Sequence, residues 1–223
     1  MELLKERYKE ILGKLHNRKP GRPSTILMEG QLDLLIDLVG DIGTELISSD
    51  YVIDQDNDQM IENLILYFIG DPLFPGDLSK GLLMVGGLGT GKTTLFKIFR
   101  EILTGLQIKD WNLRVVKCTE VVEAWEHTGW EGVAKYKTGA WCFDDLGEEN
   151  LEANHYGSRY NVMAKILSDR YERWQDEGQI THISTNYIPS LLESKYGERV
   201  MDRIAHMSNA MLFNKQINRR FQK

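Results

Sequence analysis

The pattern of hydrophobic and polar positions changes in character near residue 80. Before that point, apolar side chains recur every three or four residues, which indicates amphipathic helices. We expect helices over residues 4–15, 28–39 and 60–69. Two prolines and a glycine within residues 20–23 cannot continue a helix, so the segment after the first helix is predicted to be a linker or arm.

From about residue 80, short apolar runs alternate with longer helical segments, which is typical of a largely parallel α/β sheet. The predicted strands cover residues 82–85, 113–117, 140–143, 180–184 and 211–213. Helices are expected at residues 93–103, 120–125, 160–174 and 189–195. The pattern therefore predicts a small helical region over residues 1–75, which could bind a partner, followed by an α/β domain over residues 76–223.

The composition excludes several classes of protein. With 42% hydrophobic and 27% charged residues, the 223-residue chain is typical of a globular protein rather than a disordered or fibrous one. Its longest stretch without a charged residue, 178–192, is too short and too polar to span a membrane. Glutamates at positions 2, 6 and 10 argue against a targeting leader, so we expect a cytoplasmic protein. Two cysteines, Cys118 and Cys142, form neither a disulfide framework nor a four-thiolate zinc site.

The net charge of −6 hides an uneven distribution of charged residues. Residues 1–22 carry seven Lys and Arg against three Glu, and residues 214–223 carry four Lys and Arg with no acid. Each end is therefore +4, which leaves −14 for the middle of the chain. A contact with nucleic acid is accordingly expected from local basic patches, of which residues 14–22 and 215–223 are candidates.

Residues 86–93 fit the phosphate-loop sequence G-x-x-x-x-G-K-[ST], between a predicted strand and a predicted helix. Its glycines let backbone N–H groups point at phosphate oxygens, and the following helix adds partial positive charge. Lys92 is expected to contact the β- and γ-phosphates, and the Thr93 hydroxyl to coordinate Mg²⁺. The sequence thus predicts a site for ATP and Mg²⁺ formed by Gly86, Gly87, Leu88, Gly89, Thr90, Gly91, Lys92, Thr93 and Thr94.

Two other predicted strands end in polar residues suited to hydrolysis. Asp144 is expected to hold the Mg²⁺, and Asp145 to polarise the attacking water, with Glu148 and Glu149 as reserve candidates for the base. Asn186 is expected to hydrogen-bond the γ-phosphate and the attacking water. The alternative for Asn186 is that its side chain caps the next helix.

These motifs follow one another in a specific order. After the phosphate loop come Asp144-Asp145-Leu146-Gly147, Asp169-Arg170-Tyr171, Ser184-Thr185-Asn186 and the GERVMDRI segment at residues 197–204. The series resembles the AAA+ ATPases of the DnaC and DnaI helicase-loader and IstB transposition-helper group, over about residues 76–213. The resemblance implies a parallel sheet in which the Asn186 strand lies between the Gly86 and Asp144 strands, with Asn186 as a sensor residue. The sequence departs from the AAA+ pattern in one respect: only ten residues follow the last predicted strand, so we expect the C-terminal helical lid of many AAA+ proteins to be missing or minimal.

The same resemblance implies an arginine finger, a side chain that reaches the nucleotide of a neighbouring subunit. By motif position Arg203 is the first candidate and Arg199 the second. Activity would then depend on assembly of a homo-oligomer on ATP binding. The alternative is that both arginines form surface ion pairs with Glu198 or Asp202. Arg170 also matches a family position, although a solvated helix face explains it equally well.

Residues 123–137 combine aromatic side chains with lysines. In related loaders and initiators this interval faces the channel for single-stranded DNA, and aromatic and basic side chains suit base stacking and phosphate contact. We therefore expect Lys135, Tyr136 and Lys137 to contact DNA. The alternative is that the tryptophans of this interval belong to the core and its lysines are solvated.

Together these features predict an ATPase that acts on DNA in replication, most simply a helicase loader with a replicative helicase as partner. Two alternatives share the fold: a transposition helper that partners a transposase, and a nucleotide-gated DNA-binding switch with little turnover. A small-molecule kinase is disfavoured, because the sequence offers neither an acceptor pocket nor an arginine-bearing lid.

Overall fold

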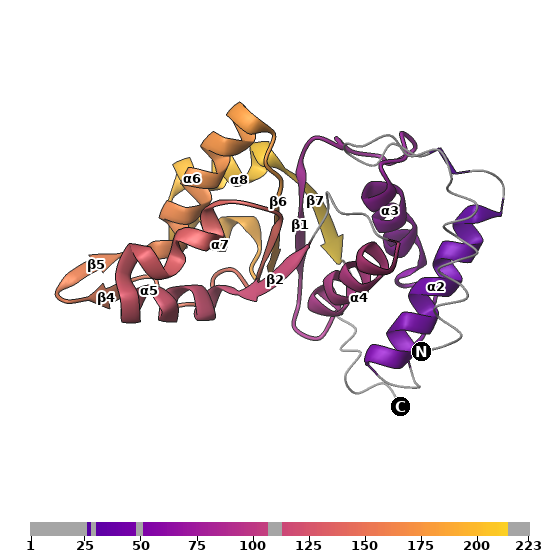
Figure 1. Ribbon diagram of the computed structural model, residues 1–223, viewed down its shortest axis with the longest axis horizontal. Coiled ribbons are helices and arrows are strands. Elements are labelled where there is room, and N and C mark those ends of the chain that lie inside the picture. Colours follow the sequence, from indigo (N-terminus) through magenta and orange to yellow (C-terminus); the bar gives the residue numbers. More distant parts are fainter. Residues whose placement is uncertain (1–25, 28–29, 48–50, 107–112, 214–223) are drawn as a thin grey trace. The chain divides into compact units, whose positions relative to one another are not determined.

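The computed structural model describes four segments of the chain, residues 26–27, 30–47, 51–106 and 113–213 (Figure 1). The helix predicted at residues 4–15 and the two basic segments at residues 14–22 and 215–223 lie outside them. The described residues form two compact units. Among these residues, no helix combines the length and the apolar character needed to cross a membrane.

The first unit contains helices α2 (Gln31–Leu46), α3 (Asp58–Ile69) and the part of α4 (Lys92–Gly105) that follows Thr93. The apolar side chains of α2 are buried along one face, as its periodicity predicts. In the core of this unit, Phe68 stacks on Phe99 with ring centroids 4.9 Å apart. This unit extends to Leu78 and takes in residues 94–113, so the division after residue 75 stays a prediction.

The second unit is built on a five-stranded sheet in the order β2–β3–β6–β1–β7, in which every neighbouring pair is parallel. The strands are β1 (Gly81–Gly86), β2 (Arg114–Lys117), β3 (Trp141–Asp144), β6 (Thr181–Thr185) and β7 (Ser208–Phe213). The predicted parallel sheet is confirmed. So is the implied position of the Asn186 strand, because β6 lies between β1 and β3.

The register of the sheet places the carboxyl ends of its central strands together. Val85 of β1 is opposite Thr185 of β6, and Phe143 of β3 is opposite Ile183. Residues that follow these strands therefore meet at one edge of the sheet, where ligands of parallel α/β sheets bind.

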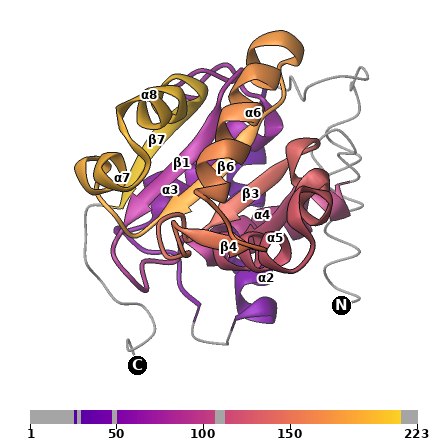
Figure 2. The ribbon, with the colours of Figure 1, turned by 90° about the vertical axis from the view of Figure 1, so that its left-hand side faces the viewer.

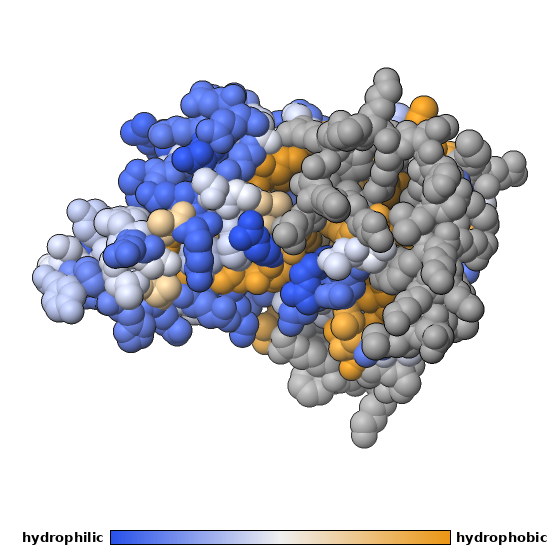
Figure 3. All heavy atoms as spheres, viewed as in Figure 1, coloured by the Kyte–Doolittle hydropathy of each residue, from blue (hydrophilic) through white to orange (hydrophobic). Residues whose placement is uncertain are grey.

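Four helices cover one face of this sheet (Figure 2). They are α5 (Cys118–Val133), α6 (Val162–Glu177), α7 (Pro189–Tyr196) and α8 (Glu198–Met207). Leu83, Phe143 and Ile183 point from the strands into the core beneath them. The outward side of α6 is hydrophilic, as expected for an amphipathic helix that packs on a sheet (Figure 3).

Three features of this unit differ from the predicted elements. Helical residues continue beyond the predicted end at Trp125, and Gly129, with φ of 63° and ψ of −150°, divides α5 into two helical segments at a kink. Helix α8 and the hairpin of β4 (Ala153–His155) and β5 (Ser158–Tyr160) have no counterpart among the predicted elements. The hairpin depends on distant contacts, since the Tyr160 and Trp125 rings pack edge to face 5.7 Å apart.

Candidate nucleotide-binding site

The predicted phosphate loop lies between β1 and α4. β1 ends at Gly86, residues 87–91 form the loop, and α4 begins at Lys92. Gly89 and Gly91 have φ of 79° and 94°, a left-handed conformation that glycine adopts without strain. A side chain at Gly86 would lie 2.5 Å from Cβ of Phe213, so the close packing of β1 on β7 also requires glycine there.

Lys92 is held at the carboxyl edge of the sheet and is 4% exposed. Its Nζ donates hydrogen bonds to the carbonyl oxygens of Gly86, at 2.8 Å, and Gly87, at 3.0 Å. It also donates to Oδ1 of Asn186 at 2.9 Å. The phosphate loop and the residue after β6, which are 94 positions apart, therefore meet at one ammonium group.

Thr93 and Asp144 meet beside Lys92. The Thr93 hydroxyl lies 2.8 and 2.9 Å from the two carboxylate oxygens of Asp144, which is 1% exposed and also accepts a hydrogen bond from Ser184. A hydroxyl and a carboxylate are the oxygen ligands that Mg²⁺ takes together with water and phosphate. The residues therefore fit the expected metal, with Thr93 and Asp144 as its protein ligands.

Asp145 lies in the turn after β3 with φ of 57°, an uncommon conformation for a residue with a side chain. Burial and the neighbouring Asp144 raise the pKa of Asp145, and Lys92 partly offsets this. Its Oδ1 accepts a hydrogen bond from Asn186 Nδ2 at 3.3 Å, and the same amide donates to Glu148 at 3.4 Å. A raised pKa suits a carboxylate that accepts a proton from water.

Glu149 differs from its expected role as a reserve base. It is 5% exposed, and its carboxylate accepts hydrogen bonds from the Gly147 N–H, at 2.9 Å, and the Tyr196 hydroxyl. A carboxylate that is buried and bonded in this way does not reach an attacking water, so that candidacy is wrong. Glu148, by contrast, is exposed and accepts a hydrogen bond from Asn186, so its role as a reserve base stays a prediction.

The two candidate finger arginines lie on α8. Arg203 NH2 is 3.8 Å from Glu172 Oε1, and its guanidinium lies over the Tyr171 ring at 5.2 Å. Its acidic partner is thus on α6, not Glu198 or Asp202. Arg199 is exposed. Among the described residues, neither arginine forms a hydrogen bond or ion pair with the group around Lys92.

Arg170 is fully buried, so the solvated helix face considered for it is wrong. Its guanidinium donates four hydrogen bonds of 2.8 Å, to the Thr181 hydroxyl and to the carbonyls of Tyr136, Gly139 and Ile180. Burial is the main cause that lowers the pKa of Arg170. The side chain connects α6 to the segments that precede β3 and β6.

Tyr136 is also buried, at 5% exposed, and its ring packs edge to face on Trp141 at 4.9 Å. A base cannot stack on this ring, so the expected DNA contact by Tyr136 is wrong. Trp125, at 1% exposed, belongs to the core, as the alternative held.

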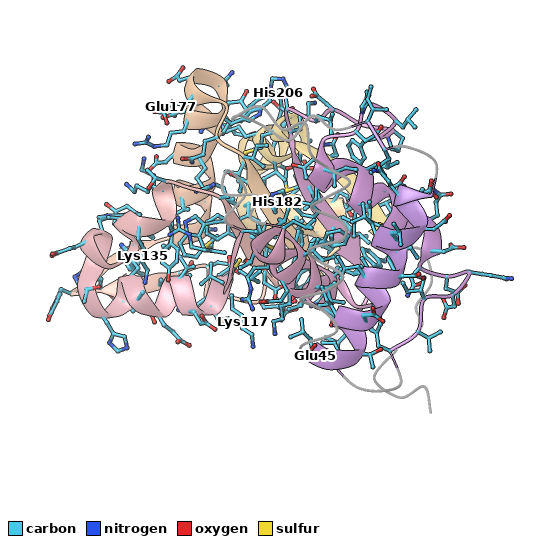
Figure 4. The ribbon with its side chains drawn as sticks, turned by 45° about the vertical axis from the view of Figure 1, so that its right-hand side comes forward. Glu45, Lys117, Lys135, Glu177, His182 and His206 are labelled. Atoms are coloured by element: carbon cyan, nitrogen blue, oxygen red, sulfur yellow. The ribbon has the colours of Figure 1, made fainter. Side chains whose placement is uncertain are left out.

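The two lysines that flank Tyr136 differ from each other. Lys137 forms an ion pair with Asp169 at 3.0 Å. Lys135, on the short helix η2 (Ala134–Lys137), is exposed, with its Nζ 4.9 Å from the centroid of the Tyr136 ring (Figure 4). Contact of these lysines with DNA stays a prediction.

The β4–β5 hairpin presents the most exposed aromatic side chain of the described chain, Tyr156, at 95%. The hairpin is tethered to α5, because the Asn154 N–H donates to Glu126 Oε1 at 3.2 Å. Its turn is closed by a hydrogen bond from the Gly157 N–H to Asn154 Oδ1 at 3.0 Å. Asparagine and glycine at this spacing are a turn signal from which the hairpin could have been predicted.

No protein-family model matches the chain, and no curated protein matches its sequence. Solved structures do match. A DnaC helicase loader is 19% identical, with a TM-score of 0.53, over 74% of this chain and 93% of that chain. DnaI is 18% identical, with a TM-score of 0.50, over 87% of this chain and 99% of that chain. AMPPCP-bound DnaA from Aquifex aeolicus is 15% identical, with a TM-score of 0.50, over 74% of this chain but 48% of DnaA. The chain has the P-loop AAA+ fold.

Proposed function

We propose that this protein binds ATP with Mg²⁺, hydrolyses it as an oligomer, and acts on DNA in replication as a helicase loader. The observation that carries the proposal is the convergence of Lys92, Thr93, Asp144, Asp145 and Asn186 at one edge of the sheet. Each has the chemistry that hydrolysis of a nucleoside triphosphate requires. The likeness to DnaC and DnaI structures supports the loader class.

Each side chain has a role that follows from its place in the site. The loop N–H groups and Lys92 bind the phosphates, and Asn186 orients the water between Lys92 and Asp145. Asp145 accepts the proton of that water as the water oxygen attacks the γ-phosphorus, and the bond between the γ-phosphorus and the β-phosphate oxygen breaks to release ADP. Thr93 and Asp144 would hold Mg²⁺, and the bound ion would neutralise charge on the phosphate oxygens.

The test is phosphate release by the purified chain with ATP and Mg²⁺, with and without single-stranded DNA. We expect hydrolysis that DNA stimulates. Absence of ATP binding in calorimetry would refute the proposal, and tight binding without turnover would instead identify a nucleotide-gated switch.

For the partner, we expect the Asp145→Asn variant to co-purify from its native host with a replicative helicase. Co-purification with a transposase would exclude the loader role.

A mixture of two inactive variants should recover activity if Arg203 acts in a neighbouring subunit. Arg203→Ala lacks the finger and should lose about a thousandfold in hydrolysis, as other arginine fingers do. Asp145→Asn lacks the base but keeps its arginine. In the mixture, Arg203 of an Asp145→Asn subunit can reach the nucleotide of a neighbouring Arg203→Ala subunit, in which Asp145 is intact. Phosphate release should therefore rise well above that of either variant alone.

The matched control for this mixture is Arg199→Ala, which removes the same charge one turn earlier on α8. If Arg199→Ala is inactive and Arg203→Ala is not, the finger is Arg199. If no mixture recovers activity, the trans arrangement is wrong.

The hairpin makes a prediction for DNA. Tyr156→Ala and Arg159→Ala are each expected to weaken binding of a single-stranded oligonucleotide about tenfold, because one removes a stacking platform and the other a phosphate contact. Fluorescence anisotropy at two salt concentrations measures both, and Arg159→Ala should also flatten the salt dependence. Arg173→Ala, which removes an exposed charge on α6, is the control. If Tyr156→Ala and Arg159→Ala bind the oligonucleotide with the same affinity as Arg173→Ala, the hairpin is excluded as a DNA contact.

A further inference from the structure

A buried pair, Glu149 and Tyr196, connects the turn that carries Asp145 to the joint between α7 and α8. The two side chains are 5% and 7% exposed. The Tyr196 hydroxyl donates to one carboxylate oxygen of Glu149, and the Gly147 N–H donates to the other at 2.9 Å. One carboxylate oxygen of Glu149 therefore bonds to Tyr196, and the other bonds to the turn at Gly147.

On one side, the turn is fixed to β6 as well as to Glu149. The Leu146 N–H donates to the Ser184 carbonyl at 2.8 Å, and the Leu146 carbonyl accepts from the Thr185 hydroxyl at 2.8 Å. Gly147 has φ of 102°, and a Cβ there would lie 2.7 Å from the Tyr187 ring. Because the turn is held at both ends, a shift of Asp145 displaces Glu149 too.

On the other side, Tyr196 is the last residue of α7. Gly197, with φ of 82°, follows it directly, and α8 begins at Glu198. The two finger candidates, Arg199 and Arg203, lie on this helix. A displacement of Tyr196 would therefore move the start of α8, the helix that carries both arginines.

The pair is suited to transmit such a displacement because water does not reach it. Burial and the adjacent Glu149 raise the pKa of Tyr196, so the phenol keeps its proton and stays a donor. When one partner of a buried hydrogen bond is lost, no water replaces it, and the remaining group is left without a partner.

We propose that Glu149 and Tyr196 are positioning residues that couple the catalytic turn of one subunit to the presentation of its own arginine to the next subunit. This inference rests on the proposed function and deepens it. It assigns the regulation of the site to one hydrogen bond between residues 47 positions apart.

The first test is Tyr196→Phe, which removes only the hydroxyl. We expect kcat to fall about tenfold, as loss of a hydrogen bond to a carboxylate allows, while KM and the affinity for a fluorescent ATP analogue stay within about twofold. The matched control is Tyr136→Phe, a buried tyrosine of the same unit that is outside the nucleotide site. Glu149→Gln should retain more activity than Glu149→Ala, because its amide can accept from Gly147 and donate to the Tyr196 oxygen.

Mixtures separate the two ends of the connection. When Tyr196→Phe is mixed with excess Asp145→Asn, only the Tyr196→Phe subunits carry an intact Asp145. Phosphate release then measures how well the turn that carries Asp145 works in Tyr196→Phe. When Tyr196→Phe is mixed with excess Arg203→Ala, only the Tyr196→Phe subunits carry Arg203. Phosphate release then measures how well these subunits present Arg203 to their neighbours. We expect both mixtures to be less active than the same mixtures made with wild-type protein.

Wild-type kcat in Tyr196→Phe would overturn the inference, as would a loss in only one of the two mixtures. A parallel fall in thermal midpoint and nucleotide affinity would show a structural role instead and would also overturn it. If the wild-type protein itself does not hydrolyse ATP, the proposed function fails. That outcome is recognised without any Tyr196 variant.

Discussion

Lys92→Ala is expected to lower ATP hydrolysis by about 10²–10³-fold, the loss typical when one charge-stabilising donor is removed from an active site. Lys92 is 4% exposed, and its ammonium group bonds to two loop carbonyls and to Asn186. Alanine removes the charge that would face the phosphates and leaves Asn186 without its donor. Phosphate release and titration with a fluorescent ATP analogue measure the two consequences, lost turnover and weakened binding.

The matched control is Lys97→Ala, an exposed lysine later on the same helix. It removes the same charge and should keep wild-type turnover, which distinguishes a local effect from a change in net charge. Wild-type hydrolysis by Lys92→Ala would contradict the proposed phosphate site. A protein that binds the analogue normally but does not turn over would limit Lys92 to the chemical step.

Arg170→Met is expected to lower the free energy of unfolding by about 3–5 kcal/mol, a loss typical of a broken buried network. The variant fills part of the space but removes all four hydrogen bonds to the Thr181 hydroxyl and the three carbonyls. Urea unfolding followed by tryptophan fluorescence measures the change, since Trp141 lies in the same unit next to Tyr136.

Arg173→Met on the same helix is the control for this change. Arg173 is partly exposed and pairs with Glu177 at 3.1 Å, and surface pairs of this kind contribute about 0–1 kcal/mol. If both variants unfold at the same urea concentration, the network does not stabilise the unit. If Arg170→Met does not fold, Arg170→Lys keeps the charge with fewer donors and should unfold at a lower urea concentration than both wild type and the Arg173→Met control.

The parallel sheet and most of the nucleotide site could be predicted because their signals are local. β1 and β3 are short apolar runs, and strands buried on both faces read this way, whereas β6 (THIST) is mostly polar although it is also buried. Asp144 ends β3, Asn186 directly follows β6, and Lys92 follows β1 after the phosphate loop, so alignment of the strand ends is enough to bring them together. The structure adds that Lys92 Nζ and Asn186 Oδ1 are within hydrogen-bonding distance.

The incorrect predictions concern side chains whose environment is set by distant parts of the chain. A basic residue on a helix, such as Arg170, usually faces solvent, and only the carbonyls around it make burial possible. Tyr136 stands between two lysines and resembles a surface residue, yet it packs on Trp141. Glu149 directly follows the exposed Glu148, but Tyr196 holds it in the interior. The partners of Arg170 and Glu149 lie 10 to 47 positions away in sequence, whereas Trp141 lies five residues after Tyr136.

The position of β6 in the sheet has a consequence for how the chain matures during synthesis. β1 and β3 pair only through β6, so the two strands have no neighbour in common until Thr185 has left the ribosome. Until then, the nascent chain presents unpaired apolar strand edges of the kind that chaperones bind and that aggregate. A stalled or truncated product that ends before residue 185 should therefore be insoluble, even though it contains the whole phosphate loop.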